Sequence, residues 1–169
     1  MKLNVAVIGG STAGKSYLKM AYDAGRLLAQ NNAVVICGGL GGVMQEVAKG
    51  VSEENGICIG LLPGHSAKEG NRYLTAALPT GIGYARNFLV VRAGDAVLAI
   101  DGANGTVSEA SFAIAEGKSV VSLRGPRLKR EKPEEGRIIE TDSVAYAVER
   151  VLKEAYIWRN SRRKVNWNG

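Results

Sequence analysis

Short runs of consecutive apolar residues recur along the chain and constrain its fold more than any other feature. They are rich in valine and isoleucine and do not alternate with polar residues, which is typical of parallel strands covered on both faces. Segments with helical spacing of apolar residues lie between them. Because strand and helix alternate, we expect right-handed βαβ crossovers and a doubly wound, mostly parallel sheet in a three-layer α/β fold. The expected strands comprise residues 3–8, 33–36, 57–62, 96–100 and 119–123.

The length of the chain, 169 residues, is typical of a single domain. Charge is unevenly placed along it: residues 1–123 carry 10 basic and 9 acidic side chains, whereas residues 124–169 carry 12 and 7. We therefore expect one ligand-binding domain over residues 1–156 and a basic tail over residues 157–169 that is solvated or contacts another subunit. The cations of this tail are Arg159, Arg162, Arg163 and Lys164.

The segment after the fifth expected strand differs in composition from the segments before it. Residues 124–136 are strongly charged and contain two prolines, so we expect an exposed loop there. The last helix is predicted over residues 143–155.

Several classes of protein are excluded by what the sequence lacks. No apolar run approaches the roughly 18–20 residues of a membrane helix, and the first residues lead into a strand without a signal peptide, so we expect a cytoplasmic protein with no membrane partner. Cys37 and Cys58 lie in apolar runs without C-x-x-C spacing and are predicted to be buried free thiols. His65 has no cluster of histidines or cysteines around it, so no metal site is expected. The basic tail contains no reader motif for a specific nucleic acid.

Glycine gathers where the expected strands end. The chain contains 22 glycines, close to twice the usual share, and they follow four of the strands. Turns and tight strand-to-helix packing use glycine in any fold. Four such turns at one edge of one sheet favour a cradle for a phosphate or nucleotide, because glycine lets backbone N–H groups approach an anion. These glycines lie at residues 9–10, 38–42, 64 and 102–105.

One glycine turn fits a well-known phosphate-binding pattern. Residues 9–16 match G-x-x-x-x-G-K-[ST] between an expected strand and an expected helix. In such a loop Lys15 would reach the β- and γ-phosphates, Ser16 would bind Mg²⁺, and Asp101 would support the metal ion. A nucleoside triphosphatase that uses Lys15 is therefore one alternative.

A longer, ordered set of motifs points elsewhere. It comprises residues 38–44, 62–64, 81–87, Asp95 and residues 105–109. Over residues 3–123 the sequence resembles the LONELY GUY (LOG) superfamily, and within it the branch similar to molybdenum-cofactor carriers. The resemblance implies a Rossmann-like homo-oligomer, a dimer or tetramer, that binds a phosphorylated, nucleotide-like small molecule and requires no resident cofactor.

Two functions follow from this resemblance. LOG enzymes are phosphoribohydrolases that cleave the N-glycosidic bond of nucleoside 5′-monophosphates, whereas the carrier-like relatives hold a phosphorylated pterin, the molybdenum cofactor, as cargo. The resemblance places catalytic roles on Arg86 and Glu109. The sequence departs from the LOG pattern in two places. Asp101-Gly102-Ala103 stands in place of Pro-Gly-Gly, and Tyr84 and Asn87 replace a histidine and a lysine. The second departure favours the carrier-like branch. The expected ligand contacts are Gly10, Ser11, Gly39, Gly41, Gly42, Met44, Asn87, Gly102, Gly105 and Thr106.

General chemistry suggests the roles of the two charged residues. We expect Thr106 to Glu109 to open a helix whose N-terminal dipole holds a phosphate and keeps the Glu109 carboxylate ionised in the first turn. A carboxylate there could stabilise an oxocarbenium-like sugar or orient water. Arg86 could bind the phosphate through its two-pronged guanidinium or stabilise charge on a departing base. The alternative is that Arg86 and Glu109 form a structural ion pair or a helix cap.

Overall fold

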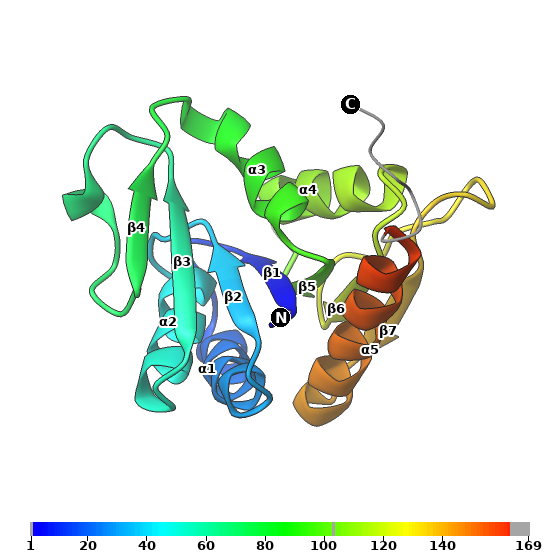
Figure 1. Cartoon of the computed structure of the whole chain (residues 1–169), viewed down its shortest axis with the longest axis horizontal. Helices are drawn as coiled ribbons and strands as arrows, with labels where there is room; N and C mark the ends of the chain where they lie inside the picture. The colour runs from blue at the N-terminus through cyan, green and yellow to red at the C-terminus, as the bar shows by residue number, and fades with distance from the viewer. Residues whose placement is uncertain (1, 103, 163–169) are drawn as a thin grey trace.

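A computed structural model describes residues 2–102 and 104–162 and contains a seven-stranded parallel sheet (Figure 1). The strand order is β4-β3-β2-β1-β5-β6-β7, so the chain reverses its direction of travel across the sheet between β1 and β5. Crevices that bind ligands form at such switch points, at the carboxyl ends of the strands. The strands span Asn4–Gly9 (β1), Val34–Cys37 (β2), Ile57–Leu62 (β3), Ala76–Pro79 (β4), Ala96–Ile100 (β5), Val120–Leu123 (β6) and Ile138–Thr141 (β7).

Helices cover both faces of this sheet, as the Rossmann-like, three-layer prediction requires (Figure 1). One hydrophobic cluster joins α1, α2 and α5 to one face, and a second joins α3 and α4 to the other. Alternate residues of β1 divide between the two clusters: Val5 and Val7 enter the first, and Ala6 and Ile8 enter the second. The helices span Lys15–Gln30 (α1), Val43–Glu53 (α2), Arg86–Ala93 (α3), Asn104–Ala115 (α4) and Val144–Arg162 (α5), with short 3₁₀ turns at Ala67–Glu69 (η1) and Gly83–Ala85 (η2).

The five predicted strands are present within a residue or two of their expected bounds, but the sequence analysis missed the two edge strands. Both β4 and β7 are four residues long and partly exposed. Each contains a residue that is unusual inside a buried parallel strand, Pro79 in β4 and Glu140 in β7. An edge strand has one free side and tolerates such residues, so it lacks the continuous apolar run that identified the others.

The last helix extends beyond its predicted end and crosses the expected boundary between residues 156 and 157. Arg159, on its final turns, donates to the Asp95 carboxylate, with Nε 3.2 Å from Oδ1, and to the carbonyl oxygen of Lys2. The expectation of a solvated or subunit-contacting cation is therefore wrong for Arg159. Its partner Asp95 directly precedes β5 and is far away in the sequence, so only tertiary packing brings the two together. Arg163 and Lys164 lie outside the described residues, as does Ala103 in the fourth glycine turn.

Cys37 and Cys58 are buried free thiols, as predicted, and their Sγ atoms lie 3.9 Å apart on neighbouring strands. Within the described part of the chain, no three histidine, cysteine or acidic side chains gather as a potential metal site. None of the helices in residues 2–102 and 104–162 is both long and apolar enough to cross a bilayer.

Candidate functional site

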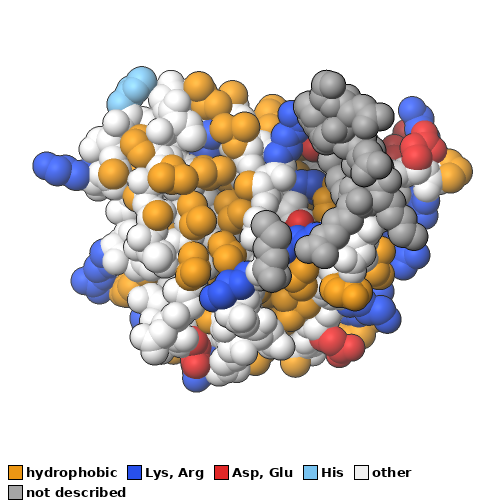
Figure 2. All heavy atoms as spheres, viewed as in Figure 1, with side chains coloured by type: hydrophobic (Ala, Val, Ile, Leu, Met, Phe, Trp, Pro, Cys, Tyr) orange, Lys and Arg blue, Asp and Glu red, His pale blue; other side chains and the backbone are white. Residues whose placement is uncertain are grey.

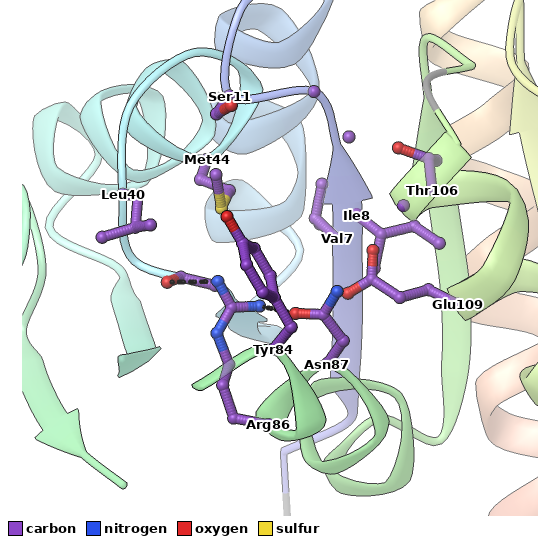
Figure 3. A pocket seen from close by; sticks show the side chains of 14 residues that line it. Val7, Ile8, Ser11, Leu40, Met44, Tyr84, Arg86, Asn87, Thr106 and Glu109 are labelled. Atoms are coloured by element: carbon purple, nitrogen blue, oxygen red, sulfur yellow. Dashed lines mark hydrogen bonds between the residues drawn. The ribbon is translucent and has the colours of Figure 1, made fainter. Parts of the chain in front are cut away.

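A cavity of about 230 Å³ opens at the carboxyl ends of β1, β2 and β5, where the strand order reverses (Figure 3). Four segments that are distant in the sequence form its walls: the end of β1, the β2–α2 loop, the start of α3, and the first turns of α4. The cavity is lined by Val7, Ile8, Gly9, Gly10, Ser11, Gly38, Leu40, Met44, Tyr84, Arg86, Asn87, Gly105, Thr106 and Glu109.

Most of the residues expected to contact a ligand meet in this cavity. The lining includes both expected catalytic residues and six of the expected contacts, Gly10, Ser11, Met44, Asn87, Gly105 and Thr106. Gly39, Gly41, Gly42 and Gly102 are not part of it. Gly42 permits a tight turn beside a lining residue, because its φ is +63° and a Cβ there would lie 2.3 Å from the Gly10 carbonyl oxygen. Some of the glycines in the run 38–42 therefore bend the chain rather than face the cavity.

Arg86 is the buried cation of the cavity. It is the first residue of α3 and is only 5 % exposed. Its Nη2 donates to the Gly38 carbonyl oxygen at 3.3 Å, and its Nη1 donates to the amide oxygen of Asn87. Nε is buried and has no hydrogen-bond partner among the described residues. Burial lowers the pKa of Arg86, while the charge of Glu109 raises it. The guanidinium lines the cavity and forms no ion pair among the described residues, so it is suited to bind an anion.

Glu109 does not behave as the sequence analysis expected. The helix α4 begins at Asn104, which places Glu109 beyond the first turn, where the helix dipole is weak. The carboxyl group is buried, and desolvation raises its pKa to about 7 even though the charge of Arg86 lowers it. The prediction that the dipole keeps Glu109 ionised is therefore wrong: at neutral pH the group is close to half protonated. A carboxyl group in this state can both donate and accept a proton.

The alternative that Arg86 and Glu109 form an ion pair is also not observed. The ion pairs found among the described residues do not join these two side chains. Figure 3 shows the Asn87 amide between the guanidinium and the carboxyl group, with its oxygen toward Arg86. Both charged side chains therefore face the cavity without neutralising each other through direct contact.

Small and hydroxylated residues form the end of the cavity near the start of α4. Ser11 and Thr106 face it from opposite sides (Figure 3). At Gly105 an added Cβ would meet no atom within 4 Å, so the backbone of the first helical turn is open to a ligand. Unpaired N–H groups of a first helical turn and nearby hydroxyl groups are common ligands of phosphate.

Lys15 lies apart from this cavity. It lines a separate surface depression between α1 and α2 together with Leu18, Lys19 and Tyr22, and both Lys15 and Ser16 are exposed. The Asp101 carboxylate accepts a hydrogen bond from the backbone N–H of Gly102 at 2.7 Å. The structure thus does not bring Lys15 to the residues that surround the cavity.

The sequence analysis did not include several lining residues. Val7 and Ile8 were assigned only to the first strand, and Leu40 only to a glycine run. Gly9 and Gly38 belonged to the predicted phosphate cradle but were not among the individual ligand contacts, and Gly38 accepts the hydrogen bond from Arg86. Tyr84 was noted only as the replacement of the LOG histidine, and its place two residues before Arg86 was the signal that could have added it to the contacts.

Comparisons with known proteins identify the family of the chain. The sequence profile of the SLOG cluster4 family matches residues 2–148, most of the chain. The chain belongs to the SLOG cluster4 family. A relative from Archaeoglobus fulgidus, described as an uncharacterized protein, is 38 % identical over 127 residues, which cover 75 % of this chain and 83 % of the relative.

Two solved structures are similar to this SLOG protein over nearly their whole length. The molybdenum cofactor binding protein of Rippkaea orientalis is 29 % identical, with a TM-score of 0.82 over 93 % of this chain and 98 % of that one. The molybdenum cofactor carrier protein of Chlamydomonas reinhardtii is 28 % identical, with a TM-score of 0.80 over 92 % of this chain and 99 % of that one.

Proposed function

We propose that this protein is a carrier that binds a phosphorylated small molecule without chemical turnover, and that its cargo is the molybdenum cofactor. The named functions of the two similar structures support a carrier. The cavity supports a phosphorylated cargo, because the open first turn of α4 and the hydroxyl groups of Ser11 and Thr106 are suited to a phosphate.

The observation that carries the proposal is the state of Arg86. Its side chain is buried and lines the cavity, yet it forms no ion pair among the described residues. A buried cation without an ion-pair partner favours an anion beside it, and the gain appears as binding affinity. In the proposed complex the Arg86 guanidinium binds an anionic group of the cargo, while Gly38 and Asn87 hold the guanidinium in place.

Direct loading tests this carrier function. The purified protein is mixed, without oxygen, with molybdenum cofactor released from a molybdoenzyme, and is then separated from free cofactor by gel filtration. We expect molybdenum and pterin fluorescence to elute with the protein. Arg86→Met should reduce this co-elution at least about tenfold, because a charge-assisted contact contributes about 1.5–3 kcal/mol. Lys15→Ala, outside the cavity, should load like the wild type. Equal loading of Arg86→Met and wild type, or no loading of either, would contradict the proposal.

A second candidate function is hydrolysis of nucleoside 5′-monophosphates, and Glu109 favours it. Its pKa of about 7 suits a group that protonates a departing base or activates water. Incubation with AMP followed by chromatography would show adenine and ribose 5-phosphate if this reaction occurs. Release of adenine by the wild type that is abolished in Glu109→Gln would establish the hydrolase. If wild-type protein at micromolar concentration releases no adenine, the carrier function stands. Tyr84 and Asn87, which replace the histidine and lysine of LOG enzymes, favour the carrier.

We also propose that the protein is a homodimer. Apolar side chains gather over β3, β4 and α3 on the face seen in Figure 2, where no helix covers the outer strands in Figure 1. The exposed apolar side chains of these elements include Leu78 of β4 and Phe88 and Leu89 of α3, and Ile82 is exposed in the segment that joins β4 to α3. An apolar surface of this kind favours association. In light-scattering measurements we expect a dimer mass for the wild type and a monomer mass for the double variant Phe88→Glu/Leu89→Glu. Tyr156→Glu, at an exposed position on α5, should remain dimeric.

A further inference from the structure

The ring of Tyr84 stands across the mouth of the cavity (Figure 3). Although Tyr84 lines the cavity, it is 86 % exposed, the largest value among the exposed large hydrophobic side chains. A phenol ring packed into the core would be buried, and Phe88 nearby finds an aromatic partner in Phe112 with ring centroids 4.5 Å apart. Tyr84 is instead held where a molecule in the cavity would cover it.

The backbone around Tyr84 is shaped to present the ring. Gly81 and Gly83 both have left-handed backbone conformations, with φ of +68° and +59°. At Gly83 an added Cβ would meet no atom within 4 Å, so its backbone conformation, and not a lack of space, explains the glycine. These two residues turn the chain through η2 immediately before Arg86 opens α3. The turn therefore fixes Tyr84 in relation to the buried guanidinium.

Apolar side chains line the cavity together with Tyr84. They are Leu40 of the β2–α2 loop and Met44 of the first turn of α2. Thioether sulfur and aliphatic carbon make favourable contacts with aromatic faces. The cavity thus has an apolar part at Tyr84, Leu40 and Met44, and a polar part at Ser11 and Thr106.

From this arrangement we infer that Tyr84 stacks on a planar heteroaromatic ring of the ligand and is the residue that selects ring-bearing phosphates over phosphates without a ring. The inference rests on the proposed binding of a phosphorylated ligand and adds the second half of that ligand: a flat ring system at the apolar part, joined to an anionic group at the polar part. Stacking of this type tolerates different rings, because each presents a π face to the phenol.

A pair of probes that differ only in the ring tests this role. AMP carries an adenine ring, and ribose 5-phosphate is the same phosphorylated sugar without it. Dissociation constants for both are measured by calorimetry with wild type, Tyr84→Ala and Tyr84→Phe. Tyr156→Ala serves as control because it removes another exposed tyrosine, which does not line the cavity. Alanine at position 84 should weaken AMP binding about tenfold and change ribose 5-phosphate binding less than twofold. Phenylalanine, which keeps the ring, should retain the affinity for AMP.

Each outcome separates this inference from the function on which it rests. Equal weakening of both probes by Tyr84→Ala would show a structural effect and overturn the stacking role, while the phosphate site would stand. Wild-type protein that binds the two probes equally well would overturn it too. If neither probe binds to the wild type, the proposed phosphate site fails, and the ring-selecting role fails with it.

Discussion

Arg86 donates a hydrogen bond to the side-chain amide oxygen of Asn87, the residue that follows it on α3. The Asn87 amide thereby lies between the guanidinium and the carboxyl group of Glu109 (Figure 3). An uncharged spacer at this point lets a buried cation and a buried acid share one cavity without direct pairing. The cation is left without an ion pair among the described residues, and the acid is close to half protonated at neutral pH. Four consequences of the structure can be measured.

The substitution Glu109→Gln should stabilise the protein in a pH-dependent way. The pKa of Glu109 is about 7 in the folded state, above the ordinary value of about 4.3 in the unfolded chain, so ionisation of Glu109 favours unfolding. Ionisation of Glu109 does not lower the free energy of unfolding below pH 4. Its effect grows between the two pKa values and is complete above pH 7. Urea denaturation should show the variant more stable by up to about 3 kcal/mol at pH 8 and by less than about 1 kcal/mol at pH 4.5. Glu149→Gln on the exposed side of α5 is the control. A difference in unfolding free energy between Glu109→Gln and wild type that does not change with pH would refute the shifted pKa.

Gly38→Ala should damage the cavity more than the fold. A methyl group at Gly38 would lie 2.6 and 2.8 Å from the two Nη atoms of Arg86 and 2.7 Å from the Met44 sulfur, so both side chains must move. We expect affinity for AMP to fall at least about tenfold and stability to fall by about 1–3 kcal/mol, as in other overpacked sites. Gly14→Ala is the matched control, because its Cβ would meet only the Tyr17 ring at 3.8 Å. Equal affinity for AMP in wild type and Gly38→Ala would show that Arg86 does not bind the ligand.

Lys118→Met should lower the stability of the region that carries Arg86. The buried ammonium group of Lys118 donates to the carbonyl oxygens of Val91, Arg92 and Gly94 at 2.9, 2.8 and 2.7 Å, which are the carbonyl groups at the end of α3. Removal of the ammonium group leaves these acceptors unpaired, with an expected loss of about 3 kcal/mol in urea denaturation. Lys68→Met at an exposed position should change stability by less than about 0.5 kcal/mol. A loss of similar size in both variants would contradict this role for Lys118.

Arg159 and Asp95 should be energetically coupled. Each side chain is only 15 % exposed, and the pair joins the end of α5 to the start of β5. Arg159→Ala and Asp95→Asn should each destabilise the protein by about 1–2 kcal/mol, and the double variant should lose about 1 kcal/mol less than the sum of the two. Thermal or urea denaturation of the four proteins gives this coupling directly. Strictly additive losses would mean that the contact contributes nothing to the attachment of α5.

The order of layers and the location of the site could be predicted from the sequence, because both depend on local patterns. Uniform apolar runs identify strands that are buried on both faces, and the glycines that follow them mark one edge of the sheet. Local patterns did not predict two features correctly, the edge strands and the positions of some cradle glycines. The edge strands β4 and β7 contain Pro79 and Glu140, which a half-exposed strand tolerates. Gly39 and Gly42 belong to the predicted cradle by their spacing, but they turn the chain and are not part of the cavity lining.

The sequence by itself determined the parallel α/β scaffold, the edge of the sheet where a ligand would bind, and the presence of Arg86 and Glu109 among the candidate residues. Only the tertiary structure decided that Asn87 separates these two, that Glu109 is buried enough to hold a proton near pH 7, and that Arg159 pairs with Asp95. The physical reason is that strand and turn preferences act over a few neighbouring residues. Desolvation and hydrogen bonding at the site depend on atoms from α3, α4 and the β1 and β2 loops, which meet only when the sheet has formed.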